Sequence, residues 1–324
     1  MNATFFVVVS NTRSGSTYLA TTLNELSQVT CDFQANWYPK PRKIDDFRLP
    51  FYPGCDVLEI LRTSLEDSIA RGTKLTFNAQ SILTSTEAGK ILDAFSQKIN
   101  IIQLRRNYLD IYASRFGRGT VHILNPDRDK ANESKLIHSI QNIQALTEQA
   151  DFEMDPLDSY KAILLFFCAD AVGRGLRIKA DRGYQIRYER ISEEIGDIAR
   201  FLKVPYRGPE IESATNRPVV KKLPPLDFEL LPNIQFAREV AAVFERAYDR
   251  LESTGENPVK QVACNEEGYL KIAMDREIQD RLSKIWQSFS LPLGSILEPG
   301  LNRIKNIDMN ERIKTLGLNN DLSK

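Results

Sequence analysis

Short apolar runs alternate along the chain with segments whose apolar residues recur at helical spacing. The apolar, β-branched and aromatic runs predict strands at residues 4–10, 29–33, 73–78, 100–104 and 184–188. The periodic segments predict helices at residues 18–26, 60–70, 86–95, 108–116, 135–149, 157–179, 191–202 and 236–251. Strands that alternate with helices are typical of a parallel sheet covered by helices on both faces. We therefore expect an α/β fold with a central, mainly parallel sheet of about five strands.

Three regions lack this alternation. Residues 34–58 are rich in Pro and aromatic side chains, which predicts an ordered but irregular loop: either a wall for an acceptor substrate or a packed connection. Residues 117–134 are polar and turn-rich, and we expect them to be mobile and to lie on the acceptor side. From Gly268 on, the sequence predicts two or three helical segments. We expect one α/β domain over residues 1–255 and a helical C-terminal extension of unknown role over residues 256–324.

The composition narrows the possible partners. The chain contains 43 Lys and Arg and 43 Asp and Glu, so its zero net charge does not predict binding to nucleic acid or to an anionic membrane. The 4 cysteines and 2 histidines lack the spacing of metal ligands, so we expect no metal and interpret the cysteines as reduced thiols of a cytoplasmic protein. We also expect no membrane-spanning segment and no cleavable leader. Amphipathic helices in the extension would allow a homodimer.

A polar loop follows the first predicted strand and opens the first predicted helix. Its sequence is Asn11-Thr12-Arg13-Ser14-Gly15-Ser16-Thr17. A helix N-terminus offers free N–H groups and a positive dipole end, which bind anions and most often phosphate. Arg13 adds a fixed charge and the hydroxyl groups add donors. We interpret the segment as a phosphate-binding loop, with an ordinary serine-capped turn as the alternative.

This loop departs from the nucleotide-binding motif G-x-x-x-x-G-K-[ST] in two places. Aligned on Gly15 and Thr17, the chain has Ser10 at the first Gly and Ser16 at the Lys. Without that Lys, the β- and γ-phosphates of ATP lose their main counter-charge. The loop therefore disfavours a kinase or an ATPase.

A second basic segment begins where the fourth predicted strand ends. Arg105 and Arg106 follow that strand, where a nucleotide triphosphatase often carries an Asp that helps to hold Mg²⁺. Ser114 lies about two helical turns after Arg106, so both side chains can meet one phosphate if Arg106 reaches along the helix. The alternative is a surface arginine pair and a buried serine. Together, loop and segment imply a ligand with two separated phosphate-like groups, bound without a metal.

Several polar residues are predicted to meet at one edge of the sheet. In parallel α/β sheets, ligands bind beyond the carboxyl ends of the strands. The predicted strand ends carry Arg13, Asp32, Asn78 and Arg106. We expect these side chains at one edge.

The two segments resemble motifs of the sulfotransferases that use 3′-phosphoadenosine 5′-phosphosulfate (PAPS). Thr12-Arg13-Ser14-Gly15-Ser16-Thr17-Tyr18-Leu19 is similar to their 5′-phosphosulfate loop, and Leu104 to Ser114 keeps the R-N-x-x-D-x-x-x-S pattern of their 3′-phosphate motif. Tyr188-Glu189-Arg190-Ile191 resembles part of their later strand and helix. The loop is most similar to those of bacterial carbohydrate sulfotransferases of the trehalose 2-sulfotransferase and nodulation-factor types. The resemblance covers about residues 4–225.

This resemblance implies a P-loop-NTPase-like three-layer fold and a metal-free reaction. A sulfuryl group would pass from PAPS to a hydroxyl of a carbohydrate or glycolipid, leaving 3′-phosphoadenosine 5′-phosphate (PAP). The residues implied to hold the 5′-phosphosulfate are Thr12, Arg13, Ser14, Gly15, Ser16 and Thr17. Arg106 and Ser114 would hold the 3′-phosphate, while Arg13 would neutralise charge on the leaving phosphate. Lys74 occupies the place of a lysine near the sulfate, with a surface lysine on an edge strand as the alternative.

Departures from the cytosolic relatives leave the general base open. Thr76 occupies the position of their catalytic His, and their C-terminal R-K-G motif is absent, with Lys221 or Lys222 as the candidate substitute. The acceptor hydroxyl needs a base. The bacterial enzymes place a carboxylate followed by aromatics after the second strand, which here is Asp32; a turn-capping Asp is the alternative. His122 is the second candidate.

Two other functions remain open. One is an ATP-dependent phosphotransferase, which the missing loop Lys and strand-end Asp disfavour. The other is a non-catalytic nucleotide-binding or scaffold protein that keeps the fold and uses the extension to interact.

Overall fold

The computed structural model describes two compact units that interleave along the chain. The described residues are 3–38, 40–41, 49–65, 67–77, 85–95, 98–114, 155–206, 233–264 and 270–296. The first unit comprises Met1–Asn107, Leu165–Lys222 and Glu245–Pro258. The second comprises Tyr108–Leu164, Leu223–Phe244 and Val259–Lys324.

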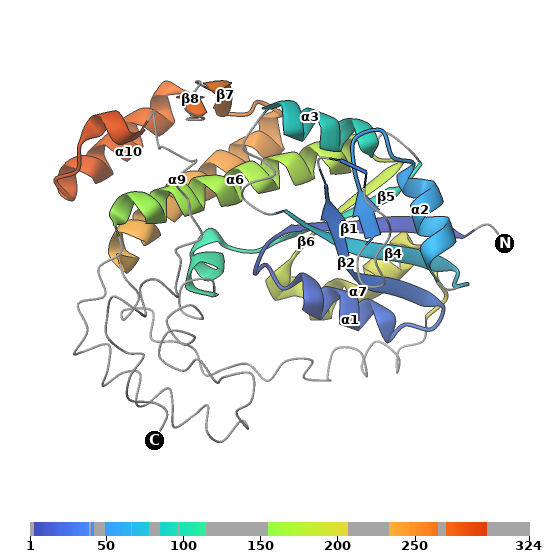
Figure 1. The fold of residues 1–324 in the computed structure, drawn as a ribbon. Coiled ribbons are helices and arrows are strands. Elements are labelled where there is room, and N and C mark those ends of the chain that lie inside the picture. The colour runs from blue at the N-terminus through green and yellow to red at the C-terminus, as the bar shows by residue number, and fades with distance from the viewer. Residues whose placement is uncertain are drawn as a thin grey trace, which may run out of the picture. The chain divides into compact units, whose positions relative to one another are not determined.

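The first unit is built on a six-stranded sheet in the order β3-β2-β4-β1-β5-β6 (Figure 1). The strands are β1 Thr4–Asn11, β2 Val29–Trp37, β3 Leu49–Phe51, β4 Ala70–Phe77, β5 Asn100–Arg105 and β6 Arg182–Arg187. Every neighbouring pair is parallel. The predicted strands are confirmed, with β3 added at one edge.

Helices cover both faces of this sheet (Figure 1). They are α1 Ser16–Asn24, α2 Val57–Ser64, α3 Ser85–Ala94, α6 Pro156–Lys179, α7 Ile191–Phe201 and α9 Ile234–Thr254, of which α6 and α9 run through both units. Apolar residues of α1 and α7 pack on one face, and those of α2, α3 and α6 pack on the other. The three layers confirm the predicted α/β class with a central parallel sheet between helices.

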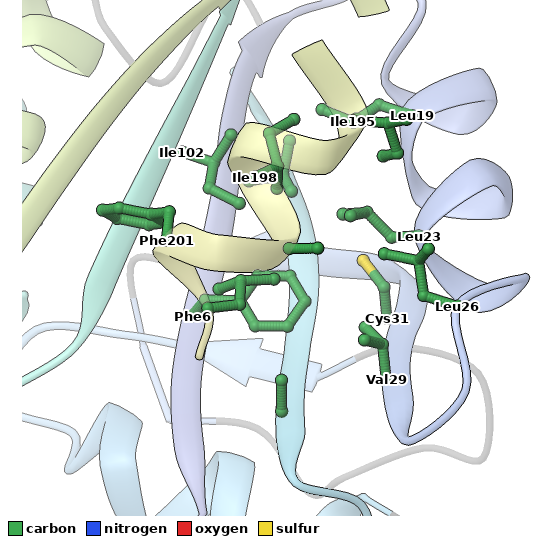
Figure 2. Close-up of a cluster of buried hydrophobic side chains, with 14 of the residues drawn as sticks. Phe6, Leu19, Leu23, Leu26, Val29, Cys31, Ile102, Ile195, Ile198 and Phe201 are labelled. Atoms are coloured by element: carbon green, nitrogen blue, oxygen red, sulfur yellow. The ribbon is translucent and has the colours of Figure 1, made fainter. Parts of the chain in front are cut away.

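Apolar side chains on both faces of β1 explain why this strand lies inside the sheet. Phe6 and Val8 face the α1/α7 layer, whereas Val7 and Val9 face the α2/α3/α6 layer, and all four are fully buried. Figure 2 shows Phe6 surrounded by side chains of α1, α7 and the neighbouring strands. Gly72 of β4 pairs with Phe6, and a Cβ there would come within 2.5 Å of the ring. Gly72 thus makes room for the Phe6 ring in the core.

Two predicted boundaries are wrong. Residues 34–58 are not simply an irregular loop, because β2 continues to Trp37 and pairs there with Phe51 of β3. Phe51 is buried and packs edge-on against Phe95, with centroids 5.4 Å apart. The helix predicted over 60–70 ends at Ser64, because Ala70 is buried in β4 and pairs with both β1 and β2.

The connections create a switch point between β1 and β5. The chain leaves β1 through α1 toward β2, on one side, and leaves β5 toward β6, on the other. In such sheets the two connections diverge and leave a crevice beyond the carboxyl ends, where ligands bind. The loop after Asn11 and the segment after Arg105 both begin there.

The second unit includes a small sheet and an aromatic core. Strands β7 Val259–Cys264 and β8 Leu270–Met274 pair antiparallel, so the helical prediction from Gly268 misses β8. Next come α10 Arg276–Ser288 and the 3-10 turn η5 Leu293–Ile296. Trp286 is fully buried against Tyr160 and Phe236, at centroid distances of 4.7 and 5.1 Å. In the described part of the chain, no helix has both the length and the apolar character to cross a membrane.

Candidate functional site

The loop after β1 turns sharply into α1. Arg13 and Gly15 adopt left-handed φ angles of 65° and 91°. Ser14 is buried, and its N–H and Oγ donate to the carbonyl oxygen of Asn11 at 3.4 and 2.7 Å. Gly15 is the N-cap, no side chain caps α1, and its first turn holds no acidic residue. The serine-capped turn is therefore wrong, and the helix terminus keeps the donors and dipole that suit an anion.

Tyr188 packs directly on this loop. It begins the 3-10 turn η3, Tyr188–Arg190, which follows β6. A Cβ on Gly15 would lie 2.2 Å from Cδ2 of the Tyr188 ring, so only glycine fits under the ring. The ring also meets Tyr18 of α1 edge-on, with centroids 6.1 Å apart. Tyr188 thereby fixes the position of the loop relative to β6.

Arg106 links the end of β5 to the loop. Its guanidinium lies over the Tyr188 ring at 4.5 Å from the centroid, and its Nη1 donates to the carbonyl oxygen of Arg13 at 3.3 Å. Its Nε is buried and has no hydrogen-bond partner among the described residues. A buried donor without an acceptor costs about 1–3 kcal/mol. A phosphate oxygen of a ligand would satisfy this donor.

Lys74 brings the loop an ammonium group that the loop sequence lacks. Its Nζ donates to Oγ1 of the exposed Thr17 at 2.7 Å. The alternative of an edge-strand lysine is wrong, because β4 lies between β2 and β1. Burial lowers the pKa of Lys74, and the nearby Cys31 and Asp32 oppose this shift. Lys74 therefore loses its proton more readily than an ordinary surface lysine.

Asp32 does not lie at the carboxyl end of its strand. β2 continues past it to Trp37, and Asp32 is in register with Thr73, well before β4 ends at Phe77. Thr73 Oγ1 donates to the carbonyl oxygen of Asp32 at 3.3 Å. Its predicted placement at the edge, and the alternative of a turn cap, are both wrong because the apolar β2–β3 pairing extends the strand.

Arg105 points to the opposite face from Arg106. It is 2% exposed; its Nε donates to Asp170 Oδ2 at 2.9 Å and its Nη2 to Glu245 Oε2 at 3.2 Å. Its guanidinium also lies 3.5 Å from the centroid of Tyr248. The alternative of a surface arginine pair is thus wrong, since Arg105 is a buried structural residue and, of the two, only Arg106 reaches the loop.

The structure brings some of the predicted site residues together and leaves others apart. Loop residues 12–17, Arg106 and Lys74 share one edge of the first unit. Ser114 lies in the second unit, at the end of the described helical segment 108–114, so its role beside Arg106 stays a prediction. His122, Asn78 and Lys222 lie outside the described residues.

Two residues of this region were not predicted. Tyr188 has a sequence signal, because an aromatic residue ends the fifth apolar run. Asp170 also has one, since it is a lone charge in the apolar helix 162–172. A charge in such a helix needs a buried partner, and the sequence could not name Asn11 and Arg105 as those partners.

No group of three or more His, Cys, Asp or Glu side chains that could hold a metal ion occurs within the described ranges. Cys31, Cys55 and Cys168 are free thiols. Burial raises the pKa of all three, that of Cys168 to about 12, so they are not reactive thiolates.

The chain shows only low similarity to the known proteins with which it was compared. No protein-family model and no curated protein matches the chain. Among solved structures, a sulfotransferase from Alicyclobacillus acidocaldarius is 14% identical and has a TM-score of 0.38, with 78% of this chain and 96% of that one covered. Mouse sulfotransferase SULT7A1, complexed with PAP, is 13% identical with a TM-score of 0.33, covering 98% and 90%. Likenesses at this level do not define what this chain binds or transfers.

Proposed function

We propose that the chain transfers a sulfuryl group from PAPS to a hydroxyl of a carbohydrate or glycolipid. The observation that supports this most is Arg106, whose buried Nε has no acceptor among the described residues. It lies beside a helix N-terminus that no described side chain caps. Both lie at the switch point between β1 and β5, and Lys74 adds a further cation to the loop. A ligand with two phosphate groups would use the loop with one and Arg106 with the other.

In this proposal the loop binds the 5′-phosphosulfate. The N–H groups of α1, Arg13 and Lys74 neutralise the phosphate as the acceptor oxygen bonds to sulfur and the bond from sulfur to the phosphate oxygen breaks. Thr12, Ser14, Gly15, Ser16 and Thr17 form the rest of the loop. The products are a sulfate ester and PAP. The 3′-phosphate is held by Arg106, with Ser114 and Lys222 as the further candidates.

Asp32 is the proposed base that takes the proton from the acceptor hydroxyl. What supports it is geometry: Asp32 is in register with Thr73, the sequence neighbour of Lys74, and its charge opposes the lowering of the Lys74 pKa by burial. His122 is the second candidate. Asp32→Asn should lower kcat and leave the KM for PAPS unchanged. An unchanged kcat would show that Asp32 is not the base, and His122→Ala would then test the second candidate.

The proposal also includes a cytoplasmic location, a carbohydrate acceptor and a possible homodimer. Free thiols at Cys31, Cys55 and Cys168 fit a reducing cytoplasm. We propose a carbohydrate acceptor because the loop sequence resembles that of bacterial carbohydrate enzymes. Light scattering on the purified chain would decide between a monomer and a homodimer.

The experiment combines binding with product detection. Isothermal titration should show PAP binding without added metal, and Arg13→Ala and Arg106→Ala should each abolish it. Arg200→Ala, an exposed arginine of α7, is the matched control and should bind like the wild type. Glycan and glycolipid extracts incubated with PAPS and the protein should gain the mass of a sulfuryl group.

Other outcomes would favour the rival functions. Transfer of phosphate from ATP that requires Mg²⁺ would replace the proposal with a phosphotransferase. PAP binding without turnover on any extract would favour a nucleotide-binding or scaffold protein. Unchanged binding in both arginine variants would show that the site is wrong.

A further inference from the structure

We propose that Asp170 is a positioning residue that sets the spacing between the two phosphate-binding halves of the site. The inference rests on the proposed function. It concerns a side chain of α6 that has no place in the phosphate-binding motifs and lies on the face of the sheet opposite the loop.

Asp170 joins the ends of the two strands that flank the switch point. It is 2% exposed; its Oδ1 accepts from Asn11 Nδ2 at 2.5 Å and its Oδ2 from Arg105 Nε at 2.9 Å. Asn11 is the last residue of β1 and Arg105 the last of β5. One carboxylate therefore fixes the two backbone positions from which the loop and Arg106 emerge.

The contacts of Asn11 transmit this restraint into the loop. Its Nδ2 also donates to the carbonyl oxygen of Phe166 in α6 at 3.0 Å. Its own carbonyl oxygen accepts from both the N–H and the Oγ of Ser14. Asp170, Asn11 and Ser14 thus form a continuous hydrogen-bonded chain from α6 to the residue that precedes the N-cap Gly15 of α1.

A buried network holds Asp170 itself in place. Its carbonyl oxygen accepts from Gln103 Nε2 at 2.9 Å, and Gln103 also bonds to Tyr248 and Arg177. The carboxylates of this network belong to Asp170, Glu245 and Glu252, and its guanidinium groups to Arg105, Arg174 and Arg177. Equal numbers of opposite charges stabilise one arrangement of the side chains, because a displacement of Arg105 or Asp170 would separate a fully buried charge from its partner.

Loss of this restraint should matter most for ligands that use both halves. PAP carries a 5′- and a 3′-phosphate, so its affinity depends on the distance between the loop and Arg106. Adenosine 5′-monophosphate (AMP) carries only the 5′-phosphate and tests the loop alone. A change in spacing should therefore weaken PAP binding and spare AMP binding, whereas general loosening should weaken both.

The test compares the affinities of three variants for PAP and AMP by titration calorimetry, at a temperature where circular dichroism shows each to be folded. Asp170→Asn keeps the shape but removes the charge, and should weaken PAP binding about tenfold or more while AMP binding stays within about twofold. Asn11→Ala keeps the Arg105 ion pair and removes only the link to β1; it should shift the ratio in the same direction. Glu252→Gln alters the network away from the strand ends and should keep the wild-type ratio.

The outcomes separate this inference from the function on which it rests. If the wild type binds neither nucleotide, the proposed function fails. If it binds both and the variants of Asp170 and Asn11 weaken PAP and AMP equally, or not at all, the positioning role is overturned. Where Asp170→Asn does not fold, the ratio measured for Asn11→Ala decides.

Discussion

Two neighbouring arginines at the end of β5 have opposite surroundings on the two faces of the sheet. Arg105 and Arg106 are adjacent, but the pleat at the end of β5 sends them to opposite faces. On the α6 side, Arg105 is paired with Asp170 and Glu245. On the α1/α7 side, Arg106 has no carboxylate partner among the described residues and meets a ring and a carbonyl oxygen.

This difference distinguishes an arginine that is paired within the fold from one that keeps its charge available for a ligand. A buried cation surrounded by carboxylates is already neutralised, so it has little to offer to an anion. A cation held by an aromatic face and one carbonyl oxygen keeps its charge and most of its donors. Two residues of the same type therefore differ: Arg105 stabilises the fold on one face, and Arg106 is available to an anion on the other.

The sharpest way to break the comparison is to truncate each arginine in turn. Arg105→Ala should lower the free energy of unfolding by about 3–5 kcal/mol, because it removes the cation that pairs with the buried Asp170 and the partly buried Glu245. Arg106→Ala should lower it by less than about 1 kcal/mol, because Arg106 makes no ion pair within the described ranges and its buried Nε has no acceptor. Urea unfolding followed by circular dichroism measures both. Equal losses would show that the two faces do not differ in this way.

A substitution of Gly15 tests whether the contact with Tyr188 is needed to hold the loop after β1 in place. Gly15→Ala should destabilise the protein by about 1–3 kcal/mol, since it combines a left-handed φ with a Cβ inside the Tyr188 ring. Gly54→Ala is the matched control, because Gly54 also has a positive φ, 79°, but nothing lies within 4 Å of its Cβ. It should cost about 1 kcal/mol and leave PAP binding unchanged. If both substitutions had the same effect on stability and binding, the contact with Tyr188 would have no role.

The smallest expected effect is a pH dependence of PAP affinity that arises from Lys74. Its lowered pKa means that the free protein loses this ammonium as pH rises through a range below that of ordinary lysines. PAP affinity should therefore be highest at low pH within the stable range and fall on the alkaline side by up to about tenfold, the loss of one charge-assisted contact. Titrations of Lys74→Arg should show a flat profile, because guanidinium stays protonated. A wild-type profile that is equally flat would contradict a contact between Lys74 and phosphate.

Much of the fold could be predicted because its signals are local. The apolar runs in β1 and β5 and the helical spacing in α7 repeat within a few residues, so pattern alone identifies them. The boundaries near β3 failed because Phe51 and Ala70 are held by pairing with strands far away in the sequence. No local pattern contains that information.

The candidate site divides in the same way. Strand, loop and helix in residues 4–24 indicate an anion site by themselves, because a helix N-terminus and its donors are local features. The sequence by itself therefore determined five of the six strands of the large sheet and the loop after β1, and it predicts a phosphate-like ligand. Only the tertiary structure decided that Lys74 reaches Thr17 and that Asp32 lies inside a strand. It also decided that Arg105 pairs with Asp170 whereas Arg106 lies over Tyr188. Those outcomes depend on which distant side chains share one buried space, and burial is a property of the folded chain as a whole.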